Sequence, residues 1–128
     1  GADPDYFFWA RHPGSRPKPP GIFDPEAAAN YLRCYRNPVT VHAICEDYRA
    51  GATIDFAHDM DDHGRRRIMC PVLVLWGKRG KVNEWYDVPA IWREWAYDVR
   101  GEQIDSGHFL AEEAPDSTYA SLRDFFAG

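Results

Sequence analysis

The chain has 128 residues, of which 45% are hydrophobic and 27% are charged, and this composition is typical of a folded globular protein. Its net charge of −5 and its dispersed basic residues argue against nucleic acid as a partner. Neither an apolar run of about 20 residues nor a secretory signal peptide is visible, so no membrane association is expected.

A basic, proline-rich segment occupies residues 11–21 (RHPGSRPKPPG) near the N-terminus. Proline fixes φ and lacks a backbone donor, so this segment is expected to be neither a helix interior nor a central strand. Pro17 and Pro20 match the minimal spacing of a polyproline ligand, but a plain surface loop is the favoured interpretation.

Three helices are predicted to follow this loop. Asp24 can cap a helix that opens on the next residue, a proline in the first turn. Asn37 repeats the same device for a second helix that ends near Gly51, and a weaker third helical pattern covers residues 53–63. Residues 1–66 are therefore predicted to form a helical segment behind a proline-rich loop.

The second half alternates between strand and helix patterns. Residues 72–76 (VLVLW) form a continuous apolar run, as expected for a strand that is covered on both faces of a parallel sheet. Pro89 can open a helix in its first turn, residues 101–105 form a short strand, and Ser117 can cap a closing helix. Residues 67–128 are predicted to form part of an open α/β sheet, in which ligands bind at the carboxyl ends of the strands.

A histidine lies in the loop that follows the last predicted strand, within residues 106–115 (SGHFLAEEAP). Imidazole titrates near neutral pH, so His108 is a candidate general base, although an isolated histidine of this kind can also be structural. Glu112 and Glu113 are expected to start the last helix, where the positive end of the helix dipole stabilises acidic side chains. No serine, aspartate or cysteine lies in the glycine-flanked elbow that a hydrolase nucleophile requires. The chain therefore holds a base without a visible nucleophile.

The remaining histidines and the cysteines show no spacing that is typical of a metal site. His58 and His63 are five positions apart, which places them on different faces of a helix, so no metal site is expected. Cys34, Cys45 and Cys70 are widely spaced, which argues against a disulfide framework and predicts a cytoplasmic protein.

Three segments of the chain resemble the fluoroacetate (haloacetate) dehalogenases of the α/β-hydrolase superfamily. They are residues 45–52 (CEDYRAGA), 75–77 (LWG) and 106–116 (SGHFLAEEAPD), and the similarity extends over residues 22–128. The SGHFL loop is shared with epoxide hydrolases, whereas the CEDYRAGA run points to a much narrower group of proteins. The resemblance implies the C-terminal half of an α/β-hydrolase, with a helical cap segment in residues 1–66 and the last two parallel strands with flanking helices after it.

This resemblance implies a reaction through an aspartyl ester. In that family an aspartate displaces the halide of a haloacetate, and a histidine, here His108, activates the water that hydrolyses the ester. Tyr48 matches the cap tyrosine that helps to bind the departing halide. Gly80 stands where many relatives carry the acid that orients the histidine, so the acid, like the nucleophile, is expected to precede Gly1. The implied substrate is a small haloacid, with no cofactor, and the full enzyme would be a homodimer.

Two alternatives stay open. In an epoxide hydrolase, Tyr48 would protonate the epoxide oxygen together with a second tyrosine, for which Tyr31 and Tyr35 are the nearby candidates. Alternatively, the chain by itself is a catalytically silent fragment that only associates with other chains, because two apolar strands without the rest of a sheet would leave unpaired edges.

Overall fold

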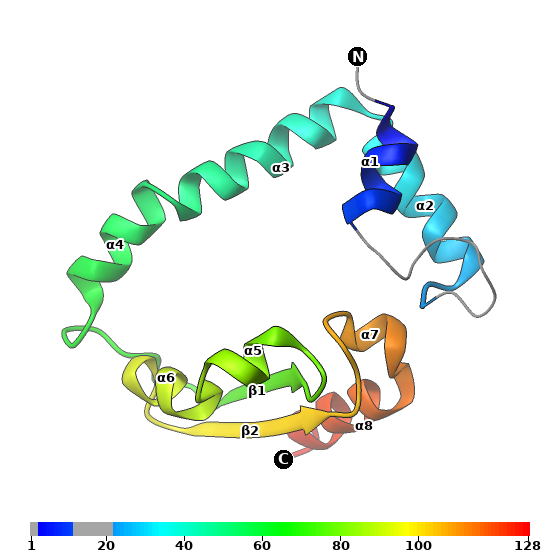
Figure 1. The fold of residues 1–128 in the computed structure, drawn as a ribbon. Coiled ribbons are helices and arrows are strands. Elements are labelled where there is room, and N and C mark those ends of the chain that lie inside the picture. The colour runs from blue at the N-terminus through cyan, green and yellow to red at the C-terminus, as the bar shows by residue number, and fades with distance from the viewer. Residues whose placement is uncertain (1–2, 12–21) are drawn as a thin grey trace. The chain divides into compact units, whose positions relative to one another are not determined.

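The computed structural model describes residues 3–11 and 22–128, which fall into two compact units, Gly1–His58 and Asp59–Gly128 (Figure 1). The residues of the predicted polyproline ligand, Pro17 and Pro20, lie outside the described residues. The units divide ahead of residue 66, and the assignment of residues 1–66 to a cap and of 67–128 to a hydrolase core stays a prediction.

The first unit is helical, and two of its helices begin where aspartate or asparagine precedes proline. The Asp24 carboxylate accepts hydrogen bonds from the backbone N–H groups of Glu26 and Ala27, at 2.8 and 3.2 Å. The Asn37 side chain accepts one from the N–H of Val39, at 3.0 Å. Both helix starts are therefore confirmed. The helices with residues in this unit are α1 (Pro4–Arg11), α2 (Pro25–Tyr35), α3 (Pro38–Gly51) and α4 (Ile54–Asp62), and α4 continues into the second unit.

An aromatic cluster forms the core of the first unit. The Phe8 side chain is only 2% exposed, and its ring lies 5.9 Å from that of Phe23, 6.3 Å from that of Tyr31 and 5.2 Å from that of Tyr35, measured between centroids. Phe8 belongs to α1, a helix that the sequence pattern did not predict. Burial of this large side chain against α2 accounts for a helix that its own local sequence signals only weakly.

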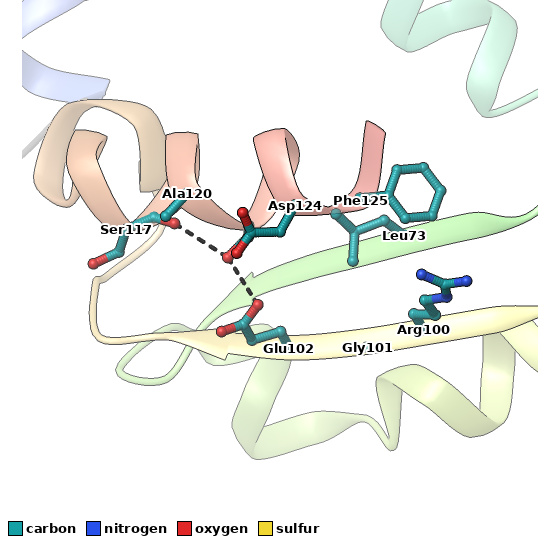
Figure 2. Close-up of a pocket in the computed structure, with 9 residues that line it drawn as sticks. Leu73, Arg100, Gly101, Glu102, Ser117, Ala120, Asp124 and Phe125 are labelled. Carbon is teal, nitrogen blue, oxygen red and sulfur yellow. Dashed lines mark hydrogen bonds between the residues drawn. The ribbon is translucent and has the colours of Figure 1, made fainter. Parts of the chain in front are cut away.

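The second unit is built around two parallel strands, as predicted. Val72 of β1 (Val72–Gly77) lies opposite Val99 of β2 (Val99–Ile104), and Gly77 lies opposite Ile104. Helices α6 and α8 lie on opposite faces of this pair (Figure 1, Figure 2), which agrees with the continuous apolar run of β1. The remaining elements are α5 (Lys81–Trp85), α6 (Val88–Trp95), α7 (Leu110–Glu113) and α8 (Pro115–Phe126).

The start of the last helix differs from the prediction. Helix α8 begins at Pro115, and Ser117 lies inside its first turn rather than at its cap. The carbonyl of Ser117 instead accepts a hydrogen bond from the Ser121 hydroxyl, at 3.1 Å. Proline is well suited to the first helical position because its fixed φ is helical and it needs no backbone acceptor there, which explains the earlier start. Large apolar side chains of α8 are open to solvent, with Phe126 80% exposed.

The core of the second unit lies mainly between the sheet and α6. Its buried apolar side chains are Val74, Val88, Ala96 and Ile104. Small side chains and a two-stranded sheet leave many large residues uncovered, among them Trp85, which is 67% exposed. Among the helices of the described residues, none combines the length and the apolar character needed to cross a membrane.

Candidate active site

The loop that carries His108 lies at the carboxyl ends of both strands. It leaves β2 through Ser106, which is fully buried and whose N–H donates to the carbonyl of Ile104 at 2.7 Å. The turn after β1 bonds to this loop, because the N–H of Lys78 donates to Ile104 at 2.8 Å and that of Arg79 donates to Ser106 at 3.0 Å. The two strand ends therefore hold the histidine loop together, at the edge where open α/β sheets bind ligands.

Two glycines allow the backbone to pack tightly at this point. A Cβ atom on Gly77 would lie 1.7 Å from the carbonyl oxygen of Gly107, which no side chain can tolerate without a backbone shift. A Cβ atom on Gly107 would in turn lie 2.8 Å from each carboxylate oxygen of Glu113. Glycine is thus required at position 77 by the close approach of two backbone segments, whereas a side chain at position 107 would displace the Glu113 carboxylate from its place beside the loop.

Glu113 contacts the histidine loop directly. Its carboxylate accepts hydrogen bonds from the N–H of Gly107 at 2.6 Å and from the N–H of Phe109 at 3.1 Å, and its side chain is 15% exposed. The prediction that Glu112 and Glu113 start the last helix is wrong, because both belong to the short helix α7 that precedes it. The two hydrogen bonds join residues four and six positions apart across a turn, and no sequence motif predicted this contact.

His108 itself is exposed and lines a pocket of about 280 Å³. Its ring makes an edge-to-face contact with Phe109, with 5.0 Å between centroids. In the described part of the chain the imidazole makes no hydrogen bond to another side chain, so a group that orients it would have to come from elsewhere. The pocket is largely apolar and of a size that suits a small molecule. It is lined by Val74, Leu75, Trp76, Gly77, Gly80, Val82, Val88, Trp92, Gly107, His108 and Leu110.

The other predicted site residues lie on helices. Tyr48 belongs to α3 in the first unit and is 70% exposed, and its role toward a halide stays a prediction. Tyr31 and Tyr35, the second tyrosines of the epoxide alternative, both pack against Phe8. Gly80 directly precedes α5 as its N-cap residue.

Two further features do not form a candidate site. A pocket of about 570 Å³ lies between α8 and the strands (Figure 2), where the Ser121 hydroxyl shares its one proton between the Ser117 carbonyl and a carboxylate oxygen of Glu102, the latter at 2.7 Å. No predicted site residue lines it. Among residues 3–11 and 22–128, no group of three or more histidine, cysteine and acidic side chains is arranged to hold a metal. His63 instead bonds to Glu94, at 2.8 Å.

The chain is similar to proteins that are described as hydrolases. No family model matches it. The chain is 36% identical over 127 residues to the fluoroacetate dehalogenase of a Burkholderia species, an alignment that covers 99% of this chain and 41% of the relative. A Nostoc structure described as a candidate α/β-hydrolase superposes with a TM-score of 0.84 and 46% sequence identity; the match covers 97% of this chain and 42% of the Nostoc chain. A Pseudomonas aeruginosa structure described as a candidate epoxide hydrolase superposes with a TM-score of 0.81 and 37% sequence identity; the match covers 99% of this chain and 42% of the Pseudomonas chain. The chain thus spans about two fifths of the length of these proteins.

Proposed function

We propose that this chain supplies the general base of a hydrolase that removes the halide from a haloacetate. The chain has the fold of the C-terminal part of the α/β-hydrolases and is homologous to fluoroacetate dehalogenase. The observation that carries the proposal is the position of His108, in a loop at the carboxyl ends of two parallel strands and beside an apolar pocket. The 36% identity to a fluoroacetate dehalogenase supports the substrate class.

In the proposed reaction, His108 acts in the second of two steps. An aspartate outside this chain attacks the carbon that bears the halogen, so a C–O bond forms as the C–halogen bond breaks and halide leaves. His108 then takes a proton from water, and the resulting hydroxide attacks the ester carbonyl. Collapse of that intermediate breaks the C–O bond to the alcohol oxygen, which takes up the proton held by His108, and the carboxyl group left on the aspartate loses its proton to solvent. This regenerates the aspartate and releases the hydroxyacid, which is glycolate when fluoroacetate is the substrate. The Tyr48 hydroxyl would donate a hydrogen bond to the departing halide, where negative charge develops.

The test is fluoride release from fluoroacetate by this chain joined behind the N-terminal part of the Burkholderia dehalogenase. Removal of the base should leave the first step intact, so the His108→Ala fusion should release about one equivalent of fluoride and then stop. Its steady-state rate should fall by about 10²- to 10⁴-fold, the usual contribution of a general base. His42→Ala, which removes an exposed histidine of α3, is the matched control and should retain turnover. Turnover by the His108→Ala fusion at close to the native rate would refute the role of His108.

A second candidate function is epoxide hydrolysis, which the 37% identity to the Pseudomonas aeruginosa structure favours. The same His108 would hydrolyse an ester formed by opening of an epoxide ring, and Tyr48 would protonate the ring oxygen. Giving the fusion a terminal epoxide in parallel with fluoroacetate separates the two substrate classes. Turnover of the epoxide alone would replace the haloacetate assignment.

The isolated chain is proposed to be inactive and to associate with other chains. Within the described residues the sheet has only two strands, so each strand has one edge without a partner strand. Such edges favour association. Size-exclusion chromatography of the chain, alone and mixed with the separately expressed N-terminal part of the Burkholderia relative, tests this. The cytoplasmic location and the homodimer also remain proposals.

A further inference from the structure

We propose that Glu113 is a positioning residue for His108, a role that rests on the proposed function of His108 as the base. The two residues on either side of His108, Gly107 and Phe109, both donate their backbone N–H groups to the Glu113 carboxylate, at 2.6 and 3.1 Å. One side chain therefore holds the Ser106–Gly107 peptide and the His108–Phe109 peptide, which lie on either side of the histidine. Together these two bonds restrict the direction in which the Cα–Cβ bond of His108 leaves the backbone.

The carboxylate is itself held in place by its surroundings. The N–H of Glu113 donates to the carbonyl of Phe109 at 2.8 Å, so these two residues bond reciprocally. The Thr118 hydroxyl shares its one proton between the carbonyls of Leu110 and Ala114, at 3.1 and 2.8 Å, and this joins α7 to α8. Glu113 thus connects the loop to a helix that packs on the sheet, a firmer support than the loop alone.

A charged carboxylate suits this position better than its neutral amide. It offers two acceptor oxygens to two N–H donors, and hydrogen bonds to a charged acceptor are roughly twice as strong as neutral ones. A glutamine would offer one oxygen and would turn an NH₂ group toward the second donor. The Arg79 guanidinium lies 3.9 Å from the carboxylate and also pairs with Asp105, so it partly balances the charge of Glu113.

The expected consequence is confined to the step that needs the base. A displacement of about 1 Å in a reacting group can reduce a rate about 10²-fold. Loss of the contact should therefore slow hydrolysis of the ester, whereas halide displacement by the aspartate does not use His108. This separates a positioning role from a general loss of folded protein, which would reduce both steps together.

The first experiment follows the backbone amides of Gly107 and Phe109 by ¹H–¹⁵N NMR in the 128-residue chain. In Glu113→Gln we expect at least one of the two amide protons to move upfield and to exchange with solvent at least 10-fold faster. Glu113→Asp, which keeps the charge but is one methylene shorter, should show the same change and serves if the glutamine variant does not fold. Glu102→Gln is the matched control, because its amide oxygen can still accept from Ser121. Unchanged amides in both Glu113 variants would overturn the proposal.

The second experiment measures fluoride release by the fusion protein. Glu113→Gln should lower kcat at least 10-fold and lower KM with it, so that kcat/KM, which reports the first step, stays nearly unchanged. The first equivalent of fluoride should still be released at the native rate. Equal loss of the first equivalent and of turnover would reduce Glu113 to a merely structural residue and overturn the proposal. If the fusion with native Glu113 releases no fluoride, the proposed function fails, and the amide signals alone decide whether the carboxylate holds the loop.

Discussion

Substitution of Gly77 by alanine tests the close approach between β1 and the His108 loop. The added Cβ would lie 1.7 Å from the carbonyl oxygen of Gly107 and 2.7 Å from its carbon, both of which are backbone atoms. Real Cβ contacts are not shorter than 3.0 Å, so the strand end and the loop must separate by about 1.3 Å. That movement would also strain the hydrogen bond from Arg79 to Ser106 and the bond from Gly107 to Glu113.

The expected cost follows from these two effects. Insertion of a methyl group into a well-packed region typically costs about 1–3 kcal/mol, and each weakened hydrogen bond adds about 1 kcal/mol. We therefore expect Gly77→Ala to reduce the free energy of unfolding by about 3 kcal/mol or more. Gly101→Ala is the matched control on the neighbouring strand, since its Cβ would meet only side-chain atoms of Pro89 and Trp76, both at 3.2 Å. Those atoms need to move by only a few tenths of an ångström.

Urea unfolding followed by tryptophan fluorescence measures this difference. With a slope of about 1–2 kcal/mol per molar urea, a loss of about 3 kcal/mol lowers the midpoint by about 1.5–3 M, or leaves the variant unfolded without urea. Gly101→Ala should unfold within about 0.5 M of the native chain. Equal midpoints for the two variants would show that the loop moves away from β1 freely, and the argument that this packing fixes the loop would be wrong.

Three further predictions concern the first unit. A side-chain hydrogen bond from Arg36 lowers the pKa of Asp5 below its ordinary value of 3.8. The ionised, paired carboxylate therefore stabilises the fold above pH 3.8, and this contribution is lost as the pH falls through the lowered pKa of the folded state. Asp5→Asn should thus lower Tm near neutral pH, and its Tm and that of the native chain should converge below pH 3.8; a constant difference would contradict this. Phe8→Ala should destabilise the unit by about 3–5 kcal/mol in urea titrations because it empties the aromatic cluster, whereas Tyr6→Ala, at a residue of the same helix that is 69% exposed, should cost far less. Asp24→Ala should cost about 1 kcal/mol and reduce the helical circular dichroism signal, since it removes the cap of α2.

Features with local chemical causes could be predicted from the sequence. The caps at Asp24 and Asn37 act on backbone N–H groups two or three residues away, so the pattern alone located both helix starts. The apolar run of β1 predicted a strand covered on both faces for a similar reason, because burial on each side leaves no polar alternation. The position of His108 after the last strand also followed from element order.

Features that depend on packing could not be predicted in this way. Helix α1 is stabilised by burial of Phe8 against side chains that come more than ten residues later. Ser117 was preferred as a cap on residue type, although Pro115 two residues earlier begins the helix. The contact of Glu113 with both sides of His108 depends on the path of a turn, which a pattern of polar and apolar residues does not encode. The halide role of Tyr48 stays a prediction.

The register of the two strands has a consequence for the order of folding. Val72 pairs with Val99, only 27 positions further along the chain, and the segment between them contains the two helices α5 and α6. Closing a chain segment of this length costs little more entropy than closing a much shorter one, and local contacts favour rapid formation. We therefore expect the strands and α6 to gain hydrogen-exchange protection together, as one cooperative unit. The loop that carries His108 would then be assembled early in folding, on a scaffold of neighbouring sequence.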